Sequence, residues 1–291
     1  IILAPTGIAA INAGGSTLHS FFKLPFHPLL PNDSMYSVRN IRNTLKYNSE
    51  KIKIIREVEL IIIDEISMVR ADIIDFLDKI LRVYCRNMRE PFGGKQLLLV
   101  GDIFQLEPVV REDDRRLLSP FYRSSFFFNA KVFEYFKLVS IELKKVYRQS
   151  DPVFISILDH IRTSQVPMQD LQRLNQRVGA QLDESDSKLA ITLSTRRDTV
   201  DYINDSQLQR LPGEPCLFRG HIQGEFPESS LPTPIELYLK TGAQVIFIKN
   251  DIEHQWVNGT LGTIIGFDED EDAKIYVRTE EGKDVMVEPA A

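Results

Sequence analysis

The sequence predicts an α/β protein with a parallel sheet covered by helices, followed by a small antiparallel β-barrel. The first observation is a pair of apolar runs, residues 60–63 and 97–100, each followed by acidic or amide side chains. Continuous apolar runs suit strands that are buried on both faces, as in a parallel sheet. The second observation is a series of short strand-like runs in the last third, with hairpin turns predicted at Asn258-Gly259 and Glu281-Gly282.

Composition sets limits on the class of protein. The chain has 291 residues, of which 43% are hydrophobic and 26% are charged, as is ordinary for a globular protein of about two domains. No apolar stretch approaches the ~20 residues that cross a bilayer, so we expect no membrane partner. The net charge of −6 excludes a globally basic nucleic-acid binder but not a local basic groove. Cys85 and Cys216 lie far apart without metal-ligand spacing, which indicates a reducing compartment.

The first predicted domain comprises residues 1–140. About residues 21–55 are rich in Pro, Asn and Ser and are expected to form a small insertion in this domain. Strands are predicted where apolar residues are continuous, and helices where they recur at three- and four-residue spacing. In chain order the expected elements are a strand at 1–3, a helix at 8–13, a strand at 60–63, a helix at 71–88 and a strand at 97–100.

Residues 141–209 are expected to begin a second α/β domain, and residues 210–291 to form the antiparallel barrel. Trp256 lies just before a hairpin turn, where an exposed ring would contact DNA or a partner and a buried ring would pack the barrel; the sequence favours neither. The expected helices are 151–166, 171–178 and 198–208. The expected strands are 139–143, 189–194, 243–248, 260–267, 274–278 and 284–287.

Polar side chains follow the two buried runs at their carboxyl ends, which is where parallel sheets bind ligands. Asp64 is suited to hold Mg²⁺ through its water shell, and Glu65 to orient a water toward a γ-phosphate. Gln105, after the neighbouring strand, is placed to sense that phosphate. The residues therefore indicate an ATP-driven motor that uses ATP and Mg²⁺, with a surface ion pair as the alternative for Asp64.

Several stretches of the chain resemble motifs of superfamily 1 DNA helicases of the Pif/RecD type, and the match covers most of the chain. Residues 91–96, Pro-Phe-Gly-Gly-Lys-Gln, resemble the signature that separates the Pif family from its RecD relatives. The other matching stretches are residues 4–10, 14–15 and 17–22 for motif Ia, 63–68 for motif II, 101–102, 105–106 and 108–109 for motif III, 143–149 for motif IV and 242–267 for the inserted barrel.

The resemblance implies a RecA-like first motor domain at residues 1–140, the beginning of a second RecA-like domain at 141–209 and an inserted Src-homology-like β-barrel at 210–291. It implies an ATP-dependent DNA helicase that moves 5′-to-3′ on single-stranded DNA and unwinds duplexes, forks and G-quadruplexes. Such an enzyme acts in DNA repair, recombination and telomere maintenance, and we expect a monomer. Its location would be the cytoplasm or nucleoid of a bacterium, or the nucleus or mitochondria of a eukaryote.

Carried over position by position, the resemblance gives roles to the residues of the nucleotide site. Asp64 would coordinate Mg²⁺ and Glu65 would be the catalytic base. Gln105 would link the state of the γ-phosphate to the grip on DNA. Arg148 would be an arginine finger from the second domain, worth ~10³ or more in rate because it stabilises charge on the transferred phosphoryl group. The alternative for Arg148 is a solvated surface arginine.

Motif Ia is expected to contact the DNA strand. The hydroxyl groups of Thr6 and Ser20 suit phosphates, which position a strand without reading its sequence. His19 and Phe22 would contact sugars or stack on bases, and such stacking is worth ~1–3 kcal/mol per base. The alternatives are a core position for Phe22, which belongs to a Phe-Phe pair, and a structural role for His19.

Two parts of the helicase pattern are absent from the sequence. The phosphate-binding loop G-x-x-x-x-G-K-[ST], which the family places before motif Ia, does not occur. Motifs V and VI, which the family places after the barrel, are not found either, and Glu107 stands where the family usually has proline. We therefore expect an internal fragment of a helicase that by itself binds and hydrolyses ATP poorly.

Two other functions remain open. The first is a non-catalytic module that binds single-stranded DNA, which a Gly-Lys-Thr or Gly-Lys-Ser shortly upstream in the reading frame would exclude. The second is a RecD-type helicase or exonuclease subunit, which shares the same chemistry. Residues 91–96 disfavour this second alternative.

Overall fold

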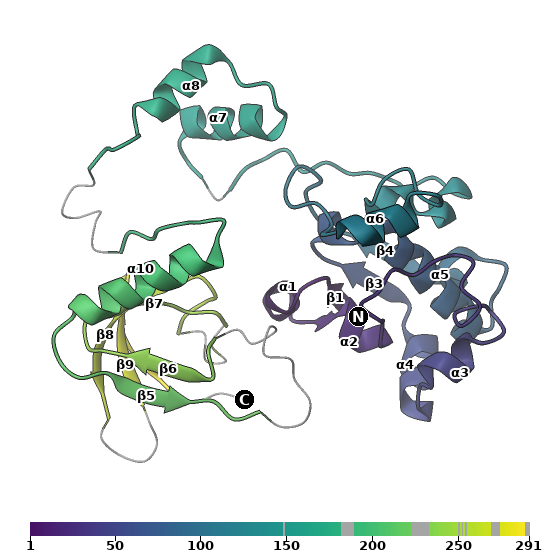
Figure 1. Cartoon of the computed structure of the whole chain (residues 1–291), viewed down its shortest axis with the longest axis horizontal. Coiled ribbons are helices and arrows are strands. Elements are labelled where there is room, and N and C mark those ends of the chain that lie inside the picture. Colours follow the sequence, from purple (N-terminus) through teal and green to yellow (C-terminus); the bar gives the residue numbers. More distant parts are fainter. Residues whose placement is uncertain are drawn as a thin grey trace. The chain divides into compact units, whose positions relative to one another are not determined.

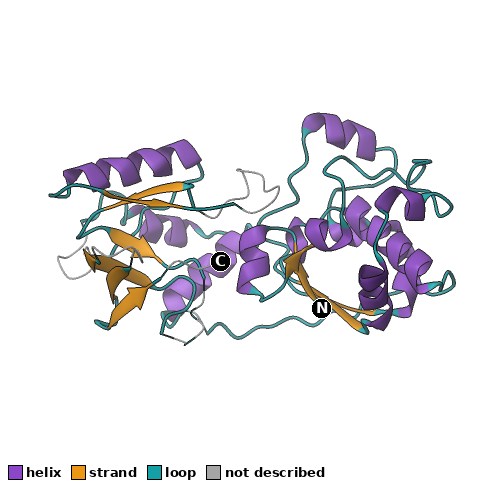
Figure 2. Ribbon diagram, turned by 90° about the horizontal axis from the view of Figure 1, so that it is seen from below, coloured by secondary structure: helices purple, strands orange, loops and turns teal. Residues whose placement is uncertain are grey.

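The structure, a computed structural model, describes residues 1–147, 149–181, 189–222, 233–249, 251, 253, 255–268 and 274–288. The chain divides into two compact units, residues 1–178 and 179–291 (Figure 1). The first unit contains a parallel sheet with helices, and the second contains antiparallel strands and a long helix (Figure 2). This confirms the predicted fold class. No described helix combines the length with the apolar character that a membrane crossing requires.

Four parallel strands form the sheet of the first unit, in the order β2-β1-β3-β4. Leu3 pairs with Ile63, and Ile63 pairs with Leu99, so the strands end at a common edge. Ile61 and Ile63 are fully buried, as the continuous apolar run predicts. The strand bounds are β1 Ile2–Ala4, β2 Ser16–Thr17, β3 Leu60–Ile63 and β4 Gln96–Leu99.

Helices pack on this sheet and close the core. In α5 (Ala71–Cys85), apolar residues recur every three or four positions, so Ile74, Leu77 and Ile80 are fully buried. The other helical elements are α1 (Gly7–Asn12), α2 (Leu18–Phe22), α3 (Ile41–Leu45), α4 (Ser49–Glu57), η1 (Ile66–Met68), η2 (Pro91–Gly94), α6 (Glu112–Leu118), η3 (Phe127–Asn129), η4 (Lys131–Glu134), α7 (Pro152–Arg162) and α8 (Met168–Asn175).

The predicted insertion, about residues 21–55, contains α3 and most of α4 and is held against the end of α5. Arg42 Nη2 donates to Val83 O at 2.6 Å, and Arg56 Nε donates to Tyr84 O at 3.0 Å. The last carbonyls of a helix lack their usual partners within the helix. The two arginines therefore supply donors to Tyr84 O and to Val83 O, which otherwise accepts only a long bond of 3.4 Å from Arg86 N. The insertion is thereby fixed to the helix that follows motif II.

The Pro-Phe-Gly-Gly segment forms the tight turn η2 against α5. Phe92 has φ 53° and Gly93 has φ 64°, both in the left-handed region. The Phe92 N–H donates to Asp78 Oδ1 at 2.5 Å. A Cβ on Gly93 would lie 2.7 Å from Leu81 O, which no side chain tolerates without movement. The segment that resembles the Pif-family signature therefore has a structural role here.

We expect Gly93→Ala to lower the free energy of unfolding by about 1–3 kcal/mol, because it adds left-handed strain and a collision with the Leu81 carbonyl. Gly7→Ala is the matched control, since nothing lies within 4 Å of its Cβ position and its φ is ordinary. Urea unfolding followed by circular dichroism measures both. Equal losses for the two variants would contradict the argument.

The second unit is built on a four-stranded antiparallel meander in the order β10-β9-β8-β7, with a separate β5-β6 hairpin. Ile264, Val277 and Val285 form its core together with Phe247. Trp256 is half-buried, stacks on Phe247 with ring centroids 4.6 Å apart, and donates from Nε1 to Lys249 O at 3.2 Å, which favours its packing role. The bounds are α10 Arg197–Arg210, β5 Cys216–Arg219, β6 Glu236–Leu239, β7 Gln244–Ile246, β8 Leu261–Phe267, β9 Ile275–Thr279 and β10 Asp284–Val287.

Two predicted strands, 139–143 and 189–194, are not strands in the structure. Their apolar side chains are exposed, Val139 by 90% and Leu193 by 86%. A single extended segment needs a neighbouring strand to satisfy its backbone, and neither segment pairs with a described strand. The helices expected around them are confirmed.

Candidate functional site

The carboxyl edge of the parallel sheet brings most of the predicted site residues together. Each strand of the sheet ends at this edge, and a loop or helix start with polar side chains follows it. Open parallel sheets bind ligands outside the carboxyl ends of their strands. The residues gathered here are Thr6 after β1, His19 and Ser20 after β2, Asp64 and Glu65 after β3, and Gln105 after β4.

Asp64 and Glu65 form a strained turn at the end of β3. Glu65 has φ 50° and ψ 43°, a left-handed conformation that costs a non-glycine residue on the order of 1 kcal/mol and is concentrated at functional sites. Its N–H donates to Asp64 Oδ1 at 2.9 Å. Within the described part of the chain, Asp64 Oδ2 and the Glu65 carboxylate have no hydrogen-bond partner, and both side chains are partly exposed. Their free oxygens are available to a hydrated cation and to a water.

The donor set fits the magnesium end of a nucleotide site. Among the described residues, no group of three or more His, Cys, Asp or Glu side chains comes together to hold a metal. Mg²⁺ is usually held by one or two carboxylates, with waters and substrate phosphates completing its coordination. A single free oxygen of Asp64 at an open edge is sufficient for the protein's share of such a site.

The loop after β4 passes close to the turn after β3. A Cβ on Gly101 would lie 3.0 Å from Ile66 N, whose N–H donates to Val100 O at 3.0 Å. Further along the loop, exposed Gln105 donates from Nε2 to Asp102 Oδ2 at 3.3 Å. The sheet thus places the Gln105 amide at the edge that the sensor role requires. The role itself stays a prediction.

Helix α7 reaches the same loop through Arg162. Its Nη1 lies 3.6 Å from Asp102 Oδ2, and its guanidinium carbon lies 5.3 Å from the centroid of the Phe104 ring. The hydrogen bond that Arg162 donates to Asp159 and the charge of Asp102 raise the pKa of Arg162, so it stays charged. Asp102 is therefore shared by Gln105 and Arg162. The sequence pattern does not indicate this contact, because its partners lie far apart in the chain.

Of three further predicted site residues, Thr6 and Ser20 lie within the described part of the chain and Arg148 does not. Thr6 is the N-cap of α1, where Oγ1 accepts from Ala9 N at 3.2 Å and the hydroxyl proton is left to donate. Ser20 is exposed on α2, and its N–H donates to Thr17 Oγ1 at 3.1 Å. Arg148, the predicted arginine finger, lies outside the described residues, and its role stays a prediction.

The structure contradicts the predicted contact between Phe22 and DNA. Phe22 is 0% exposed and belongs to the core, so its ring has no free face for a base. The reason is the spacing on α2, where Leu18 and Phe22 are four residues apart and both face inward. His19 lies on another face of the helix and is only partly buried, so its predicted contact remains open.

His19 stacks on Phe26, with ring centroids 5.0 Å apart and an interplanar angle of 7°. Burial and the positive charge of Arg70 lower the pKa of His19, and the charge of Asp72 opposes them only in part. The imidazole is therefore neutral at pH 7. Phe26 is not among the residues that the sequence singled out. The sequence feature that could have identified Phe26 is a pair of prolines, Pro25 and Pro28, on either side of an aromatic residue in a polar insertion.

The lowered pKa of His19 predicts a loss of stability in weak acid. As the pH falls below about 6.5, His19 binds a proton in the unfolded state but not yet in the folded state, so the free energy of unfolding decreases. We expect His19→Gln to reduce this decrease between about pH 7 and 5.5, above the range in which most carboxylates titrate. Urea titrations of the unaltered chain and of His19→Gln at about pH 7 and 5.5 measure the free energy of unfolding. An unchanged pH dependence in the variant would refute the assignment.

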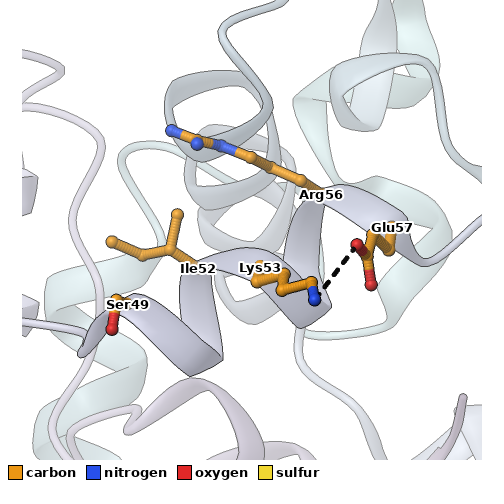
Figure 3. Close-up of a pocket in the computed structure, with 5 residues that line it drawn as sticks. All are labelled: Ser49, Ile52, Lys53, Arg56 and Glu57. Carbon is orange, nitrogen blue, oxygen red and sulfur yellow. Dashed lines mark ion pairs between the residues drawn. The ribbon is translucent and has the colours of Figure 1, made fainter.

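Two surface cavities lie away from this edge. One, of about 350 Å³, lies along α4 and is lined by Ser49, Ile52, Lys53, Arg56 and Glu57 (Figure 3). Lys53 and Glu57 are paired at 3.9 Å on its rim. The other, of about 270 Å³, lies beside α5. No predicted site residue lines either cavity, so the open edge of the sheet remains the candidate site.

Comparison with known proteins agrees with the motifs. The family model for PIF1-like helicase matches residues 1–170. The ATP-dependent DNA helicase PIF1 of Saccharomyces cerevisiae is 33% identical over 275 residues, which are 91% of this chain and 30% of the yeast protein. The chain thus spans about a third of the length of this curated relative.

Solved structures of Bacteroides Pif1 have the same fold. The crystal structure of Bacteroides sp Pif1 in complex with ADP-AlF4 is 39% identical, with a TM-score of 0.83 over 99% of this chain and 64% of that chain. The crystal structure of Bacteroides Pif1 bound to ssDNA is 40% identical, with a TM-score of 0.71 and the same coverage. The match to the family model over more than half of the sequence shows that this chain belongs to the PIF1-like helicase family.

Proposed function

We propose that this chain is part of an ATP-dependent DNA helicase that moves 5′-to-3′ on single-stranded DNA. The observation that carries the proposal is the meeting of Asp64, Glu65 and Gln105 at the carboxyl edge of a parallel sheet. Family membership and the relatives' names support it. We assign residues 1–140 to the first motor domain, 141–209 to the beginning of the second and 210–291 to the inserted barrel.

The residues of the edge divide the chemistry between them. Asp64 would hold Mg²⁺ through its free oxygen, and the ion would supply positive charge beside the phosphates of ATP. Glu65 accepts a proton from the attacking water, because its carboxylate has no competing donor within the described residues. Gln105 would replace its hydrogen bond to Asp102 with one to the γ-phosphate, and Arg148 would supply positive charge from the second domain.

The DNA contacts lie beside this chemistry. Thr6 and Ser20 donate to phosphates, and His19 contacts a sugar or base. The partners that we propose are single-stranded DNA, forks and G-quadruplexes, bound by a monomer. A Bacteroides relative solved with ssDNA supports the first of these. We propose a location with the genome, in the cytoplasm or nucleoid of a bacterium or in the nucleus or mitochondria of a eukaryote.

Strand displacement tests the proposal. The helicase with its whole motor is given a labelled duplex with either a 5′ or a 3′ single-stranded tail, together with ATP and Mg²⁺. We expect displacement from the 5′-tailed duplex alone, and loss of displacement in Asp64→Ala. Activity on the 3′-tailed duplex would overturn the direction, and full activity of the Asp64 variant would overturn the site.

A further inference from the structure

Phe26 is an exposed aromatic residue that the fold holds in a fixed position. Its side chain is 82% exposed, although burial would stabilise it. The segment around it is anchored on both sides by buried side chains, Leu24 at 5% and Leu29 at 4% exposure. Pro25 and Pro28 restrict the backbone between these anchors. The ring is thus displayed by a stiff segment rather than by a mobile loop.

Hydrogen bonds fix both ends of this segment to the candidate site. The Leu24 N–H donates to His19 O at 3.0 Å, at the end of motif Ia. The Leu29 N–H donates to Asp72 Oδ2 at 2.9 Å, at the start of α5. Asp72 also accepts two bonds from Arg70, just after motif II. The position of Phe26 is therefore set by motif Ia, which is predicted to contact the DNA strand, and by motif II, which is predicted to contact the nucleotide.

One face of the Phe26 ring is already in a stack. His19 lies parallel to it at 5.0 Å, and the imidazole is neutral because burial and Arg70 lower its pKa. The neutral His19 ring lies against one face of the Phe26 ring, and the opposite face is free to stack on a third flat ring. Stacking on aromatic side chains is how proteins hold unpaired bases without reading their sequence.

Cations close to α2 suit the backbone that carries such a base. Lys23 is exposed and ends α2, and Lys51 lies with its Nζ 3.4 Å from the centroid of the Phe21 ring. Burial lowers the pKa of Lys51, and so does the charge of Lys23 nearby. Among the described residues, neither lysine forms an ion pair with a carboxylate. Two adjacent cations without a carboxylate partner favour a phosphate group.

We propose that Phe26, supported by His19, is the platform on which an unpaired base of single-stranded DNA stacks, with Lys23 and Lys51 beside the backbone phosphates. The inference rests on the proposed function, because it takes DNA as the ligand of this edge. It adds to that function a residue that binds through the base, whereas Thr6 and Ser20 bind through phosphates.

Fluorescence anisotropy of the 291-residue chain with a labelled oligothymidine tests the inference. We expect Phe26→Ala to weaken binding about 5- to 150-fold and Phe26→Trp to restore it, since stacking needs an aromatic face. Tyr202→Ala is the matched control, because Tyr202 is 74% exposed on α10 of the second unit, whereas the sheet edge belongs to the first unit, and it should bind as the unaltered chain does. Trp fluorescence of the Phe26→Trp variant should be quenched on binding.

A second probe separates stacking from charge. An oligonucleotide with the same phosphates but abasic sugars should bind Phe26→Ala and the unaltered chain equally. Equal affinity of both proteins for oligothymidine, or equal losses on both probes, would overturn the stacking role. If the unaltered chain does not bind oligothymidine at all, the proposed DNA function itself fails and the inference falls with it. Unchanged thermal unfolding of Phe26→Ala excludes misfolding as the cause of a loss.

Discussion

Replacing Glu65 with glutamine in the helicase with its whole motor is expected to lower kcat for ATP hydrolysis by ~10²–10⁴-fold. The amide has the size of the carboxylate and keeps the left-handed backbone at this position, but it cannot accept a proton from water. Asp64 and its bond from the Glu65 N–H remain in place, because that bond involves only the backbone of residue 65. Nucleotide affinity should therefore change little.

Steady-state hydrolysis and a fluorescent-nucleotide titration measure the two quantities separately. Glu107→Gln is the matched control, since Glu107 is an exposed glutamate in the loop after β4 and has no predicted role. It should hydrolyse ATP at the unaltered rate. A Glu65→Gln protein that folds normally but no longer binds nucleotide would show that Glu65 is a ligand rather than the base, and normal turnover would remove it from the chemistry.

The parts of the site that follow buried strands were predictable from the sequence. Ile61 and Ile63 of the first apolar run are buried in the sheet, and the polar residues after the run lie at the sheet edge. The second run, residues 97–100, also reaches this edge, but Leu98 and Val100 are 48% and 42% exposed, so the prediction of a strand buried on both faces is wrong there. Position along a strand is a local property, so one sequence suffices to place Asp64 and Gln105. The same reasoning failed for residues 139–143, because an apolar run becomes a strand only when a neighbour is available to pair with it.

The contacts that link distant segments were not predictable. The hydrogen bond from Leu29 to Asp72 and the ion pair between Arg162 and Asp102 depend on how the chain returns to the sheet. No spacing rule connects such residues. Phe22 shows the opposite error, in which a motif suggested a contact but the inward face of a short helix decided the position.

Removing the Asp72 carboxylate is expected to cost about 3–5 kcal/mol of unfolding free energy in Asp72→Ala, because it leaves a buried charge without its partner. The Asp72 side chain is 0% exposed and that of Arg70 is 12% exposed, with Nη2 and Oδ2 2.7 Å apart. Burial alone would lower the pKa of Arg70, but its bonds to Asp72 outweigh this and raise it, so the guanidinium stays charged. The Leu29 N–H loses its acceptor as well.

Variants at the same pair separate charge from packing. Asp72→Asn should lose less than Asp72→Ala, because an amide oxygen at the Oδ2 position can still accept from the Leu29 N–H and from Arg70 Nη2. The double change Arg70→Met with Asp72→Leu should also cost less, since no unpaired charge remains. Glu112→Ala is the surface control: its pair with Arg116 spans 3.7 Å in solvent and should be worth less than about 1 kcal/mol. Urea unfolding of the four variants ranks them.

The Asp72 series also reports on DNA binding, because Asp72 holds one end of the segment that displays Phe26. If that anchor positions the ring, Asp72→Asn should keep oligothymidine affinity close to that of the unaltered chain, and the double variant should lose affinity although it is folded. Stability and binding would then follow different orders across the series. If affinity instead follows stability alone, Asp72 supports the fold and has no part in placing Phe26.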